Sequence, residues 1–489
     1  MTIDVLHPLV QTLSKSEKRY CRLMAGRQGG NKGFLQLLDI LLRHEQMGQS
    51  LTDDLVAAFP GQTIEPARKH LYHVVMQRLR QFEQLKHVDV RLSHLLHDAQ
   101  ILFERGLVQF SQSQLVKAQR LADRHERSFY AILATRQQLE QGVRGQFDGL
   151  DEATLANQHA LVRQQLERAQ TALNHAALYE TLLFRYQTKG TVSSAAETLR
   201  LNDLLLEEYQ LLNRQKQRSF AIQQQHLHFQ SAYFRMIGEG AGSLRVYREL
   251  DDLFQANGSL WAEQPFYYVQ LLEGILFDLR MLGQYAEMPY YIDRLRAIGI
   301  PAQGLRQPVP YLILYYSLLV NVDQGQYTAA YTLLQQTYLA ADRALFERDL
   351  NQLALPARLD FVLLLVRIDL GIGQLSAGLQ RLNRVLTLPG RSLPRTLFVQ
   401  SRLLNLLVHA RLGNADYLNY AVRSVSRKLH TMGAPAAGEQ LVLRLLNAWL
   451  AGRLGAASLA QIDGFVGSPA DHQLLRNLDF RAWAVVMHT

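Results

Sequence analysis

Two neighbouring segments carry the same interruption at the same point. Residues 266–298 read FYYVQLLEGILFDLRMLGQYAEMPYYIDRLRAI, and residues 311–341 read YLILYYSLLVNVDQGQYTAAYTLLQQTYLAA. In each, two apolar runs at helical spacing are separated by Gly-Gln-Tyr, which begins at Gly283 in the first segment and at Gly325 in the second. A glycine turn between two such runs indicates a helix, a tight turn and a second helix. The pair therefore predicts two consecutive helical hairpins.

The same kind of break recurs further along the chain. Glycines stand at Gly373 and Gly413, so the intervals are 42 (325 − 283), 48 (373 − 325) and 40 (413 − 373) residues. A period in the forties with helical patterning on both sides of each break is typical of a repeat array, in which each hairpin packs on its neighbours. The sequence thus predicts an all-α fold.

The turn at Gly325 resembles the turn of a tetratricopeptide repeat (TPR), in which Gly-x-Tyr is followed by a small residue. Gly325, Tyr327 and Ala330 match that pattern, whereas the first hairpin has Met288 in the place of the small residue. The period is also longer than the about 34 residues of the family. The resemblance implies a right-handed TPR-like helical-hairpin solenoid with degenerate repeats, whose first helices line a concave surface.

We expect four parts along the chain. Residues 1–90 form an N-terminal helical domain, for which a helix-turn-helix-like arrangement is one interpretation. Residues 91–218 form irregular helical hairpins, residues 219–435 the TPR-like repeats, and residues 436–489 C-terminal capping helices that end in a helix around residues 472–486.

Local signals predict where individual helices begin and break. Ser14 and Glu17 have the spacing of a capping box, and Ser219 is expected to cap a later helix. Residues 150–187 contain no glycine or proline and are expected to hold two helices with a tight break. Residues 88–90 could form a short strand. Residues 13–19 also resemble the start of some uncharacterised bacterial helical-repeat proteins, a resemblance that implies no function.

Composition restricts the class of protein. Hydrophobic residues make up 48% of the 489 residues and charged residues 19%, which indicates a folded chain. The formal net charge of +9 suits ordinary solubility, or alternatively an anionic partner. Cys21 is the single cysteine, so no intramolecular disulfide can form. No apolar run reaches the ~20 residues of a membrane helix. We expect a cytoplasmic protein that does not contact a membrane.

The sequence carries no motif for catalysis or for a cofactor. It lacks the glycine-rich phosphate loop and the Gly-x-Ser-x-Gly nucleophile turn. His94 and His97 could share one helix face, but a metal site needs a third ligand, and none is evident. Cys21 is interpreted as a packing residue. We therefore predict no catalytic residue, no metal site, no cofactor and no enzyme.

A basic helix face is the first candidate binding surface. In the helix expected at residues 65–86, the side opposite the apolar face carries Lys69, His73, Gln77 and Arg80. Basic and amide side chains on one exposed face suit contacts to phosphates and base edges. The alternative is an ordinary solvated face.

Tyrosines on the repeats are the second candidate. Tyr268, Tyr291 and Tyr316 belong to adjacent aromatic pairs, of which one member should be partly exposed. Tyrosine on a concave surface suits peptide binding, because it offers a large apolar area and a hydroxyl. Tyr315 begins an i, i+3, i+4, i+7 apolar stripe, so we expect Tyr316 to be the more exposed of that pair. The alternative is that these tyrosines only pack the hairpins together.

Two functional hypotheses follow. The first is a non-catalytic protein–protein interaction scaffold or adaptor that binds a protein or peptide on its concave surface. The second is a nucleic-acid-binding regulator, with a helix-turn-helix-like N-terminal domain and a TPR-like solenoid that senses a partner.

The second hypothesis makes a prediction about salt dependence. If the N-terminal domain binds nucleic acid, replacing both Lys69 and Arg80 by alanine weakens binding and reduces the slope of log affinity against log salt by roughly one to two units. Binding to duplex DNA measured by fluorescence anisotropy over a salt series checks this. A wild-type protein that binds no nucleic acid at low salt excludes the hypothesis.

Overall fold

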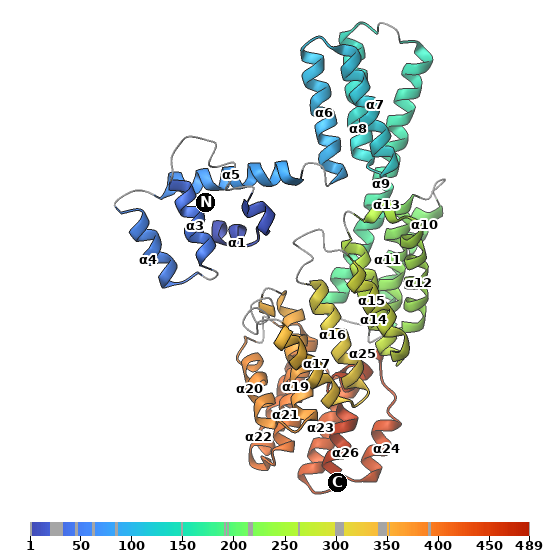
Figure 1. The fold of residues 1–489 in the computed structure, drawn as a ribbon. Helices are drawn as coiled ribbons and strands as arrows, with labels where there is room; N and C mark the ends of the chain where they lie inside the picture. The colour runs from blue at the N-terminus through green and yellow to red at the C-terminus, as the bar shows by residue number, and fades with distance from the viewer. Residues whose placement is uncertain are drawn as a thin grey trace. The chain divides into compact units, whose positions relative to one another are not determined.

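The computed structural model describes most of the chain. The described residues are 2–19, 33–44, 47–60, 64–83, 87–147, 150–189, 192, 195–213, 219–262, 265–298, 308–340, 350–351, 353–389 and 393–488. They contain helices and no strand, and the all-α prediction is confirmed for them (Figure 1). The chain divides into two compact units, residues 1–167 and 168–489. The boundary falls within the long helix α9 (Glu152–Lys189).

The first part of unit 1 is a small bundle centred on α3. Its labelled helices are α1 (Ile3–Gln11), α3 (Gly33–Arg43), α4 (Gln49–Ala58) and α5 (Glu65–Glu83). The other three pack against α3, whose buried Leu37 and Leu41 share an apolar core with Leu71 of α5. The predicted capping box is confirmed, because the Ser14 N–H donates to Glu17 Oε2 at 2.7 Å and the Glu17 N–H donates to Ser14 Oγ at 3.3 Å.

The rest of unit 1 is an array of long helices that corrects two predictions. These helices are α6 (Val88–Glu104), α7 (Val108–Arg124), α8 (Ser128–Arg144) and the first part of α9. The strand expected at residues 88–90 is wrong: Val88 is buried and belongs to a helical stripe with Leu92 and Leu96. The break expected within residues 150–187 is also wrong, because α9 is one helix of 38 residues. A stretch without glycine or proline offers no reason to break.

Unit 2 is built from helices that pack as neighbouring pairs. Its helices are α10 (Ala195–Asn213), α11 (Phe220–Met236), α12 (Gly240–Ala256), α13 (Gly258–Trp261), α14 (Phe266–Met281), η1 (Tyr285–Glu287), α15 (Met288–Ala297), α16 (Pro308–Asp323), α17 (Tyr327–Ala340), α19 (Leu355–Gly371), α20 (Leu375–Leu386), α21 (Arg395–Arg411), α22 (Ala415–Thr431), α23 (Ala437–Leu450), α24 (Ala456–Asp463), α25 (Pro469–Asn477) and α26 (Phe480–His488). Ser219 caps α11 as predicted, since its hydroxyl accepts from the Ile222 N–H at 3.3 Å.

The two predicted hairpins are confirmed as α14–α15 and α16–α17. Their turns, and those of the next two hairpins, place glycine in the left-handed region, with φ of +73° at Gly283, +74° at Gly325, +80° at Gly373 and +73° at Gly413. Glycine adopts this conformation without the steric cost that a side chain imposes. The recurring glycines therefore mark the turns because backbone geometry requires them there.

Buried ion pairs join helices that lie one repeat apart. Arg280 Nε on α14 lies 2.6 Å from Asp323 Oδ2 on α16, and Arg367 Nη2 on α19 lies 2.9 Å from Asp323 Oδ1. Arg235 on α11 pairs with Asp278 on α14 in the same way, at 3.2 Å. The separations along the chain are 43 (323 − 280), 44 (367 − 323) and 43 (278 − 235) residues. Each pair therefore spans about one period of the array.

Asp323 is ionised in this network. Burial by itself would raise the pKa of its carboxyl, but the two guanidinium groups of Arg280 and Arg367 outweigh burial and hold the pKa below its usual value. The stabilisation is therefore complete above the ordinary aspartate pKa and is lost only as the pH falls through the lowered folded-state value.

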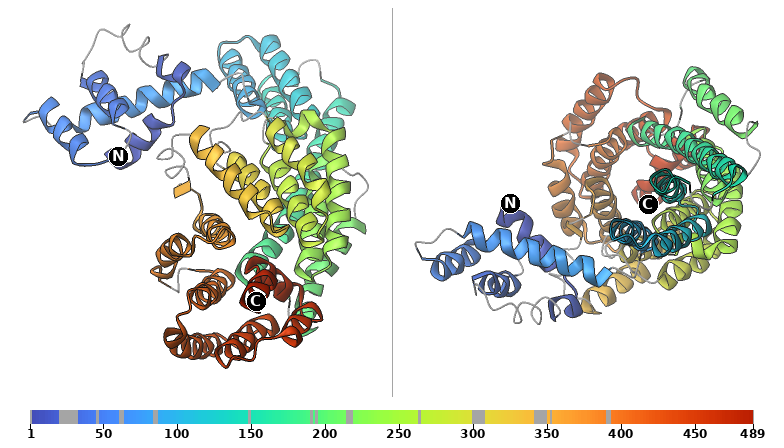
Figure 2. Two further views of the ribbon diagram at one scale, coloured as in Figure 1. Left: turned by 60° about the horizontal axis from the view of Figure 1, so that its bottom comes forward. Right: turned by 90° about the horizontal axis from the view of Figure 1, so that it is seen from above.

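The C-terminal helices fold back onto the earlier hairpins of unit 2 (Figure 2). Arg280 Nη2 donates to Asn477 Oδ1 at 2.9 Å, the Arg476 guanidinium donates to the Arg280 carbonyl oxygen, and the Tyr327 hydroxyl donates to Asp479. The single helix expected at residues 472–486 is wrong. Asp479, with φ of +52°, separates α25 from α26, and the turn directs Phe480 into the core.

The buried network predicts a large effect of a small change. Asp323→Asn keeps the shape of the side chain but leaves two buried guanidinium groups without their counter-charge, which should lower the free energy of unfolding by about 3–5 kcal/mol. Chemical denaturation monitored by circular dichroism measures this.

The matched control is Glu287→Gln, which removes the exposed Arg248–Glu287 pair, also an interaction between neighbouring hairpins. It should cost less than about 1 kcal/mol. Equal losses in the two variants would contradict the structural role given to Asp323.

Candidate functional site

The predicted basic residues of α5 do lie on one exposed stripe. Lys69, His73, Gln77 and Arg80 are all exposed. However, Lys69 Nζ lies 3.1 Å from Glu65 Oε1, so part of the positive charge of this face is already neutralised. The connection between α4 and α5 covers residues 59–64, which is longer than the three or four residues of a helix-turn-helix turn. The stripe exists, but its setting differs from that of a recognition helix.

The tyrosines chosen from the sequence do not line an open groove. Tyr268, Tyr291 and Tyr316 are only 4%, 7% and 4% exposed. The prediction that Tyr316 is more exposed than Tyr315 is wrong, since Tyr315 is the partly exposed member. The reason is that α16 packs against α14 on one side and α19 on the other, so its buried arc is wider than one apolar stripe. Tyr316 faces α14, where its hydroxyl donates to the Glu273 carbonyl oxygen at 3.4 Å.

Three consecutive first helices instead bring together a different set of side chains. Glu273 on α14, Tyr315 on α16 and Asp360 on α19 keep solvent access, and together with Tyr311 and Phe361 they form what we call the inner-face site. The Tyr311 and Tyr315 rings stack with centroids 5.5 Å apart, and Tyr311 meets Phe361 at 5.6 Å. The Tyr311 hydroxyl donates to the Ala357 carbonyl oxygen at 2.9 Å, which fixes that ring. Tyr311 and Tyr315 are thus the accessible rings, with the fully buried Phe361 behind them, and the two carboxyl groups lie near these rings.

The protonation of these carboxylates is unusual. Burial raises the pKa of Asp360 to about 7, with Arg280 opposing the rise and the negative charge of Glu273 adding to it. Burial also raises the pKa of Glu273, and the positive charge of Arg235 opposes this rise. Glu273 is exposed on α14, and the protein atoms around it partly desolvate its carboxyl group.

Neither carboxylate has a counter-ion or hydrogen-bond partner among the described residues, whereas Asp278 and Asp323 on the same run of helices each hold a guanidinium group. Paired carboxylates of this kind stabilise the array. An unpaired carboxylate with a perturbed pKa is a candidate for function. The sequence did carry a signal, because Glu273 and Asp360 each interrupt an apolar run.

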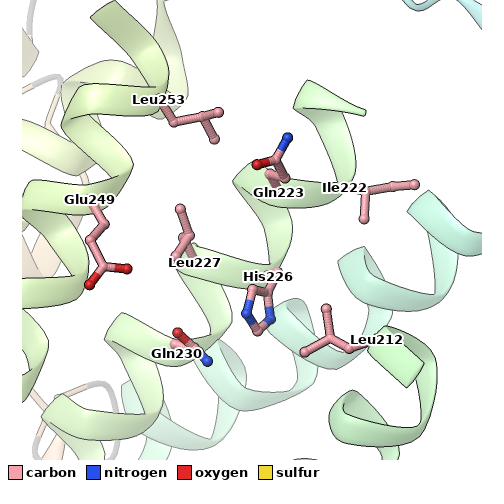
Figure 3. A pocket seen from close by; sticks show the side chains of 8 residues that line it. All are labelled: Leu212, Ile222, Gln223, His226, Leu227, Gln230, Glu249 and Leu253. Carbon is pink, nitrogen blue, oxygen red and sulfur yellow. The ribbon is translucent and has the colours of Figure 1, made fainter. Parts of the chain in front are cut away.

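A second recess lies between α10, α11 and α12 and measures about 550 Å³ (Figure 3). His226 reaches into it, and its Nδ1 lies 2.7 Å from Glu208 Oε1. The Glu208 carboxylate is 2% exposed and also lies 2.9 Å from Nδ1 of His175 on α9. His226 and His228 are two residues apart and lie in different surroundings, because His228 is almost completely buried.

Unit 1 has a groove of its own between α6 and α8, of about 630 Å³. His97 lines it, together with Phe129 and Leu133, which are 57% and 50% exposed. Because α6 and α8 flank α7, this groove lies where two alternate helices of the array face each other. This groove offers no charged carboxylate or guanidinium group to a ligand, so it is a weaker candidate than the inner-face site.

The described residues hold no group of three or more His, Cys, Asp or Glu side chains placed to bind a metal ion. In the same residues, no helix is both long and apolar enough to cross a membrane. Cys21 lies outside the described part of the chain. Comparison with protein-family models, with curated proteins and with solved structures gives no match to this chain. A functional proposal for this chain therefore rests on the geometry of the sites.

The raised pKa of Asp360 predicts a pH dependence of stability. Its carboxyl holds a proton more tightly in the folded than in the unfolded chain, so its contribution to stability is full below the ordinary aspartate pKa and is lost as the pH rises through about 7. Asp360→Asn should remove this loss. At about pH 8 the variant should exceed the wild type by about 4 kcal/mol in unfolding free energy.

Urea denaturation at a series of pH values measures the difference between the two proteins. Asp416→Asn, which changes an exposed carboxylate on α22, is the control and should follow the wild type. Parallel pH profiles for the wild type and Asp360→Asn would contradict the assignment.

Proposed function

We propose that this chain is a non-catalytic scaffold, a right-handed solenoid of TPR-like hairpins that binds a basic segment of a partner protein at the inner-face site. The observation that carries the proposal is the pair of unpaired carboxylates, Glu273 and Asp360, beside the partly exposed rings of Tyr311 and Tyr315. A lysine or arginine side chain supplies the counter-charge that the free protein lacks. Aromatic faces add attraction for the same cation.

The energetics favour a cation as the ligand. In the free protein, burial raises the pKa of Asp360 to about 7, so a substantial fraction of this carboxyl group is protonated near neutral pH. Arg280 is close enough to lower the pKa of Asp360, but it is committed to Asp323. When a cation binds, Asp360 therefore loses its proton, and the carboxylate that forms pairs with the cation. Charge complementarity of this kind gives specificity as well as affinity.

Binding suits this site better than catalysis does. The described surroundings of the two carboxylates are rings, guanidinium groups and apolar helices. General acid–base chemistry would need a group to receive or supply the proton next to a reacting centre, and nucleophilic chemistry would need an activated hydroxyl or thiol. An acidic and aromatic surface on stacked helices instead fits recognition of an extended segment.

A second candidate function rests on unit 1. The shared exposure of Lys69, His73, Gln77 and Arg80 on one stripe of α5 supports a nucleic-acid-binding regulator. The Glu65–Lys69 pair and the long connection before α5 make it the weaker of the two. The salt-dependence experiment on the double alanine variant decides it.

The scaffold proposal predicts that basic peptides are selected and that binding releases a proton. Peptides enriched in lysine or arginine should be recovered from a random library on the full-length protein. Their affinity should rise between about pH 6 and pH 8, because Asp360 must lose its proton to pair with the cation. Titration calorimetry in buffers of different ionisation enthalpy measures the proton release.

The variant Glu273→Gln/Asp360→Asn should weaken the selected peptides by at least about tenfold, the effect of losing roughly 1.4 kcal/mol. The control Glu287→Gln/Asp416→Asn removes two exposed carboxylates of unit 2 and should change affinity less than about twofold. Recovery of peptides without basic residues, or equal binding by both double variants, would overturn the proposal.

A further inference from the structure

The recess between α10, α11 and α12 has the composition of a binding site with apolar walls and polar ends (Figure 3). Leu212, Ile222, Leu227 and Leu253 supply its apolar surface. Its polar lining consists of Gln223, His226, Gln230 and Glu249. No lysine or arginine is among the described residues that line it. The recess thus lacks a permanent positive charge.

Buried Glu208 fixes the orientation of His226. Burial by itself would raise the pKa of this carboxyl, but hydrogen bonds from His175 and His226 outweigh burial and keep the pKa below its usual value. Glu208 is therefore an anionic acceptor, so the Nδ1 atom of each imidazole must carry the donated proton. In the neutral ring the other nitrogen, Nε2, is then an acceptor. His226 thus carries an acceptor on the ring edge away from Glu208 and lines the recess.

Glu249 provides the charge of the recess. It projects from α12, is exposed, and has no ion-pair or hydrogen-bond partner among the described residues. Figure 3 shows it across the recess from His226, with Leu227 and Gln230 between them. A carboxylate, an imidazole acceptor and side-chain amide oxygens around leucine side chains complement a ligand with several N–H donors, one positive charge and an aliphatic chain.

We infer that this recess binds a primary alkylammonium group. The ammonium pairs with Glu249, and the aliphatic chain packs on Leu227 and Leu253, toward the polar end of the recess that His226 lines. The same chemistry has two sources, a free aliphatic amine or the lysine side chain of a partner. The site does not depend on the inner-face site, which uses other helices of unit 2.

Ligand-observed NMR titration of the full-length protein tests the inference. The probes are n-pentylamine, its neutral analogue n-pentanol, and Nα-acetyl-lysine methylamide. We expect n-pentylamine to bind saturably and at least about tenfold more tightly than n-pentanol, because only the amine carries the charge. Glu249→Gln, an exposed substitution that should not disturb folding, is expected to weaken the amine by about tenfold.

Asp416→Asn removes one exposed negative charge elsewhere in unit 2 and should leave the affinity within about twofold of the wild type. His226→Phe changes the opposite end of the recess and should weaken the amine less than Glu249→Gln does; its thermal unfolding is measured beside the binding. Because the inner-face site is itself proposed to take a lysine or arginine side chain, the Glu249→Gln comparison is repeated in the Glu273→Gln/Asp360→Asn variant, where it should again weaken the amine by about tenfold. The proposal for the inner-face site and the inference for this recess can therefore each fail without the other.

Two outcomes support the site, and they distinguish which kind of molecule supplies the ammonium group. Binding of both amines assigns the recess to a lysine side chain, and binding of n-pentylamine alone assigns it to a free amine. The inference is overturned if neither amine binds saturably, if n-pentanol binds as well as n-pentylamine, or if Glu249→Gln binds like the wild type.

Discussion

The chain of charges Arg280–Asp323–Arg367 is the constraint on which unit 2 depends. Its three side chains are between 1% and 4% exposed and come from three successive first helices, α14, α16 and α19. Buried charges are tolerated only when geometry and hydrogen bonding compensate the loss of water. The two guanidinium groups and the one carboxylate can meet only if the hairpins are stacked in one register. Arg280 also holds Asn477, so the same residue ties the C-terminal helices to the array.

This arrangement separates structural charges from available ones. On α14, Asp278 pairs with Arg235 and Arg280 pairs with Asp323, while Glu273 is left without a partner among the described residues. Asp360 on α19 is in the same position, although Arg367 on that helix is paired. The cations of the inner face are thus committed to holding the repeats together. Burial raises the pKa values of Glu273 and Asp360, and no ion pair among the described residues offsets this rise; that is the physical basis of the inner-face site.

The features that sequence predicted correctly are local ones. Gly283 and Gly325 mark turns because a positive φ is a property of one residue, and the Ser14–Glu17 box depends on residues three apart. The exposure of Tyr315 and Tyr316 could not be predicted in this way, because α16 has neighbours on two sides. Glu273 and Asp323 look alike in the sequence. Only the structure shows that a guanidinium group one repeat away reaches Asp323 and not Glu273.

The central claim is that the inner-face site of the free protein holds a carboxyl group, that of Asp360, whose pKa burial raises to about 7 and which has no counter-ion among the described residues. Infrared difference spectroscopy between about pH 6 and pH 8 observes the carbonyl band of a protonated carboxylic acid directly. The account predicts that this band is present at about pH 6 in the wild type, that it is lost in Asp360→Asn, and that it disappears when a basic peptide binds. A band that is absent at that pH, or that persists unchanged in Asp360→Asn, would contradict it.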